Sequence, residues 1–140
     1  MAGIEIQVVR RTPFTVPAIS TGTYVYPPLV HFIDTLGWVS GVLLVRVYAT
    51  TATSSASFTV GVFNQMISAD DPAVTFNEAT DIAAVTFAGN VAVPTLLTAK
   101  IPTNSANALG RLLGVRLQVA ASAALTGIVT IGVDLVGRDA

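Results

Sequence analysis

A two-residue alternation of apolar and other side chains is the feature that most constrains the fold of this chain. In segment 41–50, Leu43 and Val47 fall on one face of an extended chain and Arg46 falls on the other. Successive side chains of a β-strand point to opposite faces, and no segment keeps an apolar period of 3.6 residues. The pattern therefore predicts strands and almost no helix. The alternation recurs in segments 41–50, 57–65, 113–119 and 128–136.

The inward members of these segments form the predicted core. They are Leu43, Val45, Val47, Phe58, Val60, Val62, Leu117, Val119, Val129, Ile131 and Val133. Further extended segments at 4–8, 23–26, 82–87 and 91–101 bring the expected total to about eight strands. Eight antiparallel strands in two packed sheets make a jelly roll, so the predicted fold class is an all-β, antiparallel, jelly-roll-like sandwich. An immunoglobulin-like sandwich is the alternative, although its Cys…Trp…Cys pattern is absent from the sequence.

Prolines and polar residues interrupt this pattern. Segment 66–81 is acidic and contains Pro72, and it is predicted to be a long surface loop with one helical turn at most. Segment 1–28 contains four prolines, which cannot donate ladder hydrogen bonds. This N-terminal segment is expected to be either an edge strand of the sandwich or an arm that pairs with another chain. No internal repeat or long linker divides the sequence, so residues 1–140 are predicted to be a single β-sandwich domain.

The composition disfavours nucleic-acid binding, enzyme activity and cofactor binding. Charged residues make up 11% of the 140 residues and the net charge is −1, whereas about 25% charged is usual for a soluble domain. Neutralising phosphates takes an excess of Lys and Arg, so no nucleic-acid partner is expected. The chain has no cysteine and one histidine, His31, which is expected to pack or to form hydrogen bonds. No nucleophile elbow or phosphate-binding loop is present, so we expect no enzyme activity, no catalytic residue and no cofactor.

Four acidic residues in one predicted loop are the candidates for a metal site. Asp70, Asp71, Glu78 and Asp81 supply carboxylate oxygens, which are the ligands that Ca²⁺ takes in proteins. Their spacing is not that of an EF-hand, and a solvated turn is the simpler interpretation, because Asp and Pro are ordinary loop formers. No resident metal is predicted.

Three further residues are candidates for contact with a partner. Arg10 and Arg11 are expected to meet acidic groups of another protein if the N-terminal segment is an arm. Trp38, the single tryptophan, is either a stacking platform for a sugar or a cap at one end of the core.

The mean hydropathy of +0.70 is high for a soluble domain. The long uncharged stretch between Arg46 and Asp70 is rich in Ser and Thr, so it does not read as a transmembrane helix, and no membrane partner is expected. The first residues do not place positive charge before an apolar run, as a signal peptide does. Polar cover this thin implies that copies of the chain, or a larger assembly, bury much of the surface. A homo-oligomer is expected, a trimer rather than a dimer.

The chain resembles the small, cysteine-free β-sandwich proteins of tailed bacteriophage virions. The resemblance rests on 37–39 leading into 43–49, on 60–64 running into 69–72, and on 113–117 with 133–139. It implies a head decoration, cement or minor capsid protein that binds and reinforces the major capsid lattice. The implied partners are the major capsid protein or other virion proteins. The implied location is the capsid surface of the virion, after synthesis in the host cytoplasm without a signal peptide. The alternative is a carbohydrate- or receptor-binding module on a fibre or spike.

Overall fold

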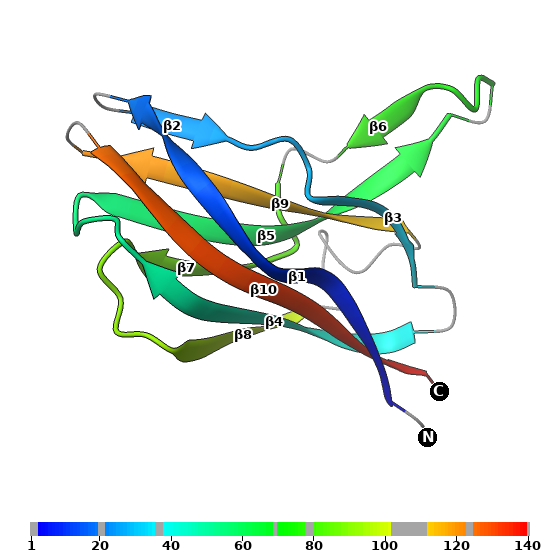
Figure 1. The fold of residues 1–140 in the computed structure, drawn as a ribbon. Coiled ribbons are helices and arrows are strands. Elements are labelled where there is room, and N and C mark those ends of the chain that lie inside the picture. Colours follow the sequence, from blue (N-terminus) through cyan, green and yellow to red (C-terminus); the bar gives the residue numbers. More distant parts are fainter. Residues whose placement is uncertain are drawn as a thin grey trace.

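The computed structural model describes residues 3–19, 22–35, 38–68, 70–77, 80–101, 112–122 and 125–139. Strands account for most of these residues, and none of them lies in a helix (Figure 1). The predicted all-β fold is therefore confirmed. The strands are β1 (Gly3–Ile19), β2 (Gly22–Val25), β3 (Val30–Asp34), β4 (Trp38–Thr50), β5 (Ala56–Ile67), β6 (Thr75–Asn77), β7 (Ala83–Ala88), β8 (Thr95–Ile101), β9 (Leu112–Ala121) and β10 (Leu125–Asp139).

The strands pair antiparallel in two sheets that pack face to face (Figure 1). One sheet has the order β1-β10-β4-β8. In the other sheet, β2 and β3 both pair with β9, β9 pairs with β5, and β6 and β7 both pair with β5. β2 and β3 can be counted as one interrupted strand, and β6 and β7 as another. When the resulting eight strands are numbered in chain order, the two sheets have the orders 1-8-3-6 and 2-7-4-5. The first strand then pairs with the last and the second with the seventh, which is the strand order of a jelly roll. The predicted jelly-roll-like sandwich is confirmed.

Prolines interrupt the strand formed by β2 and β3. Pro27 and Pro28 lie between the two pieces, and neither has an N–H to donate. On either side, the N–H groups of Tyr26 and Leu29 still donate to carbonyls of β9, at 2.9 and 2.8 Å. The chain therefore follows β9 across the gap, although the ladder is locally broken.

Segment 66–81 is not the plain loop that the sequence predicts. β5 continues to Ile67, and β6 turns back along it with Thr75 opposite Ile67 and Asn77 opposite Gln65. The described part of this segment holds a strand and no helical turn. The error arises because a strand as short as Thr75–Asn77 shows no measurable alternation, so the surrounding acids and Pro72 dominated the prediction.

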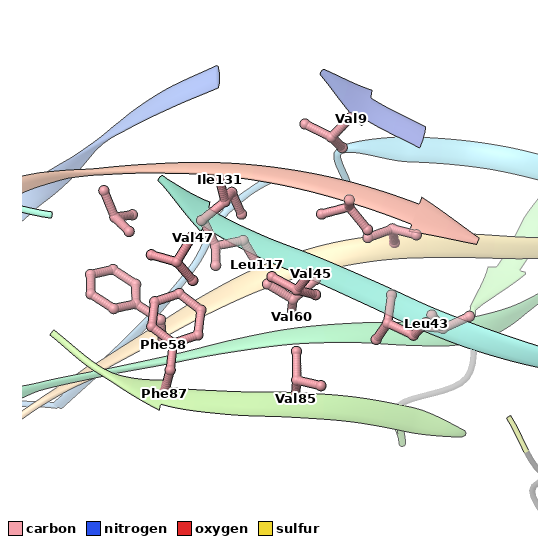
Figure 2. Close-up of a cluster of buried hydrophobic side chains, with 14 of the residues drawn as sticks. Val9, Leu43, Val45, Val47, Phe58, Val60, Val85, Phe87, Leu117 and Ile131 are labelled. Atoms are coloured by element: carbon pink, nitrogen blue, oxygen red, sulfur yellow. The ribbon is translucent and has the colours of Figure 1, made fainter. Parts of the chain in front are cut away.

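The space between the sheets is filled by aliphatic and aromatic side chains from both of them (Figure 2). All eleven residues predicted for the core are at most 1% exposed, so this prediction is confirmed. Phe58 of β5 and Phe87 of β7 stack with ring centroids 5.4 Å apart. Each large apolar side chain buried in this way stabilises the fold by about 1.5–3 kcal/mol. These buried side chains account for part of the high mean hydropathy.

Strand β1 lies along β10 at one edge of its sheet (Figure 1). Its register has three shifts, and Pro13 sits opposite Thr130. An edge strand tolerates proline because one of its sides has no ladder to supply. The Tyr26 hydroxyl donates to the Thr15 carbonyl at 2.6 Å, and the Phe14 and Tyr26 rings meet edge to face at 5.8 Å. These contacts attach β1 to the second sheet as well as to β10.

Candidate interaction surfaces

The alternation that fills the core also builds two outer faces with different chemistry. We call the outer surface of the β1-β10-β4-β8 sheet the charged face and that of the other sheet the uncharged face. The charged face carries Glu5, Arg11, Arg46, Lys100, Asp134 and Arg138. The uncharged face carries two rows across β2, β9, β5 and β7. They are Thr23, Ala120, Ser57 and Ala88, and Val25, Gln118, Thr59 and Thr86.

An ion pair lies in the middle of the charged face. The Arg46 guanidinium of β4 donates to the Asp134 carboxylate of β10, and the Asp134 side chain is 7% exposed. The hydrogen bond to Asp134 and the charge of that carboxylate raise the pKa of Arg46. A buried carboxylate needs such a partner, because removing an ionised group from water is costly.

A second interaction crosses three strands of the same face. The Arg11 guanidinium of β1 lies 4.8 Å from the centre of the Tyr48 ring, which is cation–π distance. The ring of Tyr48 in β4 lies over Gly132 of β10, where an added Cβ would be 3.2 Å from the ring. Glycine at this position therefore lets Tyr48 reach across β10 towards Arg11.

Two hollows open on the charged face. One, of about 260 Å³, lies beside Tyr48, Pro94 and Leu96. The other, of about 450 Å³, lies where β4, β8 and β10 run side by side, and we call it the basic hollow. Its floor is apolar, with Val42 and Val136, and its charged lining residues are the cations Lys100 and Arg138. The remaining lining residues are Ser40, Gly41 and Thr98.

Further along the uncharged face lies a cluster around Phe63. The Arg116 guanidinium lies 4.5 Å from the centre of the Phe63 ring and pairs with Asp81 at 2.7 Å. Phe63 points away from the sandwich core yet is 1% exposed, because Arg116 covers it and Gly114 leaves room for its ring. Burial raises the pKa of Asp81 above its usual value, and Arg116 offsets part of the rise.

The β5–β6 hairpin extends beyond the rest of its sheet at one end of the molecule (Figure 1). Four of its large apolar side chains are exposed, namely Met66, Ile67, Val74 and Phe76. Asp70 and Asp71 lie at its turn, where the Ser68 hydroxyl accepts from both of their N–H groups at 3.3 Å. We call residues 66–68 and 70–76 the hairpin tip.

The acidic residues predicted as a cation site are placed differently from one another. Asp71 accepts from the N–H of Ala73 at 3.0 Å, an ordinary turn contact, and Asp70 is exposed beside it. Asp81 instead faces Arg116 on β9. Glu78 lies outside the described residues. Among the residues that the structure describes, no three His, Cys, Asp or Glu side chains are grouped so as to hold a metal ion.

The other predicted contact residues lie on separate parts of the fold. Arg10 is exposed on β1, and Arg11 beside it lies over Tyr48. Trp38 is half-buried at the start of β4, and its indole lies against Gly137 while packing on the core. The backbone of His31 belongs to β3, but its side chain lies outside the described part of the chain. In the described ranges, no helix is long and apolar enough to cross a membrane.

Several surface residues with a defined role were not identified from the sequence. Arg46 was assigned to the outer side of its strand, but its pairing with Asp134, 88 positions away, has no local signal. The cations of the basic hollow come from two strands that are distant in sequence, so they too lack one. The hairpin tip did have a signal, because Met66 and Ile67 are adjacent apolar residues that break the alternation of 57–65.

Comparison with known proteins shows a likeness in fold and none in sequence family. No protein-family model matches the chain, and no curated protein matches it. Among solved structures, it is similar to a chain in the structure of infectious bursal disease virus Gx strain, with a TM-score of 0.51, 13% identity and coverage of 99% of this chain and 32% of that one. The structure of the Gt strain gives a TM-score of 0.48 at 14% identity, with coverage of 99% and 33%.

The chain thus spans about a third of the length of the viral chains that it resembles. At 13% identity the likeness to the Gx strain structure concerns the fold alone. It agrees with the strand order derived above and defines the chain as a jelly-roll β-sandwich of a kind that a virus structure also contains.

Proposed function

We propose that this chain is a non-enzymatic structural protein of a virus particle, which binds the major capsid subunits as a decoration, cement or minor capsid protein. The observation that carries the proposal is the jelly-roll strand order, 1-8-3-6 and 2-7-4-5, together with the fold likeness to a chain in a virus structure. The resemblance to virion proteins of tailed bacteriophages leads to the same function.

The surface chemistry supports a role in assembly. Two rows of the uncharged face hold small or uncharged side chains, and the next row holds Arg116, which is paired with Asp81. Burying such a surface against another protein removes little unpaired charge from water, which is the main cost at an interface. We assign this face to contact with the capsid lattice. A homo-oligomer, with three copies favoured over two, fits the same role at a junction between subunits.

The proposal is tested by mixing the purified chain with particles of the virus that encodes it. We expect the chain to sediment with particles at a fixed stoichiometry, and cryo-electron microscopy to show sandwich-shaped density on the capsid surface. A chain that remains in the supernatant at micromolar concentration would contradict the proposal.

A matched pair of variants tests which face is involved. Thr86→Lys places a charge on the uncharged face, and Thr15→Lys places the same charge on an exposed position of β1 in the other sheet. We expect the first to weaken particle binding about tenfold or more, because an unpaired cation must then be buried. The second should bind as the unmodified chain does. Equal binding by both variants would exclude the uncharged face as the surface that contacts the capsid.

A further inference from the structure

We propose that the hairpin tip of one copy of this chain docks into the basic hollow of a second copy. The contact joins two different surfaces of the same protein, so that copies associate head to tail. This goes beyond the function proposed above, because it requires no capsid lattice.

The hairpin tip has the properties of an inserted element. Met66 and Phe76 are 59% and 57% exposed, although both are large apolar side chains. Val74 is exposed on the same side of the hairpin, and Ile67 is exposed on its other side. The hairpin extends past the end of its sheet (Figure 1), and these four side chains remain exposed there. Contiguous exposed apolar groups of this kind mark sites of contact with other proteins.

The basic hollow is complementary to this tip in charge and in polarity. Its charged lining residues, Lys100 and Arg138, are both cations, whereas the charges at the hairpin turn, Asp70 and Asp71, are both anions. All four residues are exposed. Complementary charges of this kind favour one docked orientation and speed encounter.

The apolar parts also correspond. Val42 and Val136 form the floor of the hollow, and its volume of about 450 Å³ lies in the range of about 300–1,000 Å³ typical of binding clefts. A side chain such as Phe76 or Met66 can enter a space of that size. The occupant would then bury apolar surface while its two carboxylates remain near the cations at the rim.

One molecule cannot make this contact with itself. The tip belongs to the β2-β9-β5 sheet, and the hollow lies on the face of the other sheet that points away from it, so the core separates the two. The partner is therefore another copy. A contact between two different surfaces is heterologous, and it closes into a ring or continues as an open chain, depending on the rotation between copies.

The test is a charge exchange monitored by sedimentation velocity across a concentration series. The tip variant Asp70→Lys/Asp71→Asn and the hollow variant Lys100→Glu/Arg138→Glu should each weaken self-association about tenfold or more, because like charges or unpaired charges then meet. Asn at position 71 keeps an oxygen that can accept from the Ala73 N–H, so the turn is preserved. The two variants mixed together should associate again, because the unmodified tip of the hollow variant can dock into the unmodified hollow of the tip variant.

Controls separate charge from general effects. Arg10→Glu changes an exposed cation on β1, away from both surfaces, and should leave self-association unchanged. Phe76→Ser should weaken association in the presence and absence of salt, whereas the charge variants lose their effect as salt screens it. Circular dichroism verifies that each variant keeps its strands. The conservative hollow variant Lys100→Gln/Arg138→Gln serves in place of any reversal that fails to fold.

The outcomes distinguish this inference from the proposed function. A chain that stays monomeric at concentrations of about a millimolar, or variants that do not recombine, would overturn the head-to-tail contact. Recombination of the charge variants without binding to particles would support the contact and contradict the capsid role. Particle binding by a strictly monomeric chain would support the capsid role and contradict the head-to-tail contact.

Discussion

Replacing Gly137 by alanine should displace the single tryptophan of the chain. An added Cβ at this position of β10 would lie less than 3.0 Å from three atoms of the Trp38 indole, a distance that real Cβ atoms do not show. Two of these atoms belong to the rigid ring fusion, so a small rotation does not relieve the clash. Trp38 must therefore either move away from β10 or push β4 away from β10 at the point where Trp38 pairs with Asp139.

The magnitude follows from two opposing effects. Overpacking of this kind costs about 1–3 kcal/mol, whereas replacing glycine by alanine in a strand gains about 0.4–1 kcal/mol by restricting the unfolded chain. We expect a net loss of about 1–2 kcal/mol, which for a chain of this size lowers the melting midpoint by about 3–7 °C. The tryptophan emission should also move to longer wavelength, because the displaced indole enters water.

A double-mutant cycle makes this reasoning refutable. In a Trp38→Ala background the clash is absent, so Gly137→Ala should become neutral or stabilising when unfolding is followed by circular dichroism. Gly132→Ala is a graded comparison, because its Cβ would be 3.2 Å from Tyr48 and a smaller loss is expected. If Gly137→Ala costs the same free energy with and without Trp38, the packing of the indole on this glycine is not its cause.

Three further predictions concern other parts of the fold. Phe58→Ala should lower the free energy of unfolding by about 3–5 kcal/mol in denaturant titrations, since it removes a fully buried ring stacked on the core; a loss below about 1 kcal/mol would contradict the core assignment. Asp134→Ala should lower the free energy of unfolding by about 1–2 kcal/mol, a value that takes into account the partial exposure of Arg46. In the Asp134→Ala background, Arg46→Ala should lower that free energy little further. Burial raises the pKa of Asp81 in the folded state, so Asp81 stabilises the fold at pH values below its unfolded-state pKa. This stabilisation is lost as the pH rises through the folded-state pKa, and the Asp81→Asn variant should not show that decrease in stability. In the Arg116→Met variant, carboxyl NMR should show the Asp81 pKa rising further, and a fall would refute the offset attributed to Arg116.

Much of the sandwich was predictable because its information is local. Leu43, Val45 and Val47 lie on one side of β4 because of strand geometry, and any partner sheet must cover that side. The same reasoning fixed the inward residues of β5, β9 and β10, all of which are buried. The same alternation places Phe63 on the side of β5 opposite Phe58 and Val60. It did not predict that Phe63 is buried there, because burial depends on Arg116, which lies 53 positions further along the chain (116 − 63).

Pairing between distant segments explains most of what the sequence did not reveal. The carboxylates of Asp70 and Asp81 are close in sequence, so they were grouped as one possible site. In the fold, Asp81 follows β6 and faces β9, whereas Asp70 remains at the hairpin turn. Strand order decides such placements, and no single segment encodes it. Surfaces assembled from several strands, such as the basic hollow, are therefore invisible until the register of β4, β8 and β10 is known.

The uneven distribution of charge gives the two proposals a common geometry. Six of the described charged residues lie on the charged face, whereas the charges on the uncharged face are Arg116, which is paired with Asp81, and Asp34 of β3. Burying the charged face against a large flat partner would desolvate several ions, while burying the uncharged face would desolvate few. A chain bound to a capsid through its uncharged face would direct its charged face, with the basic hollow, towards solvent. The hairpin tip leaves the end of the sheet, between these two surfaces, where the hollow of a neighbouring copy can receive it. Contact with the lattice and contact between copies then use separate surfaces, so both can form at once on the same particle.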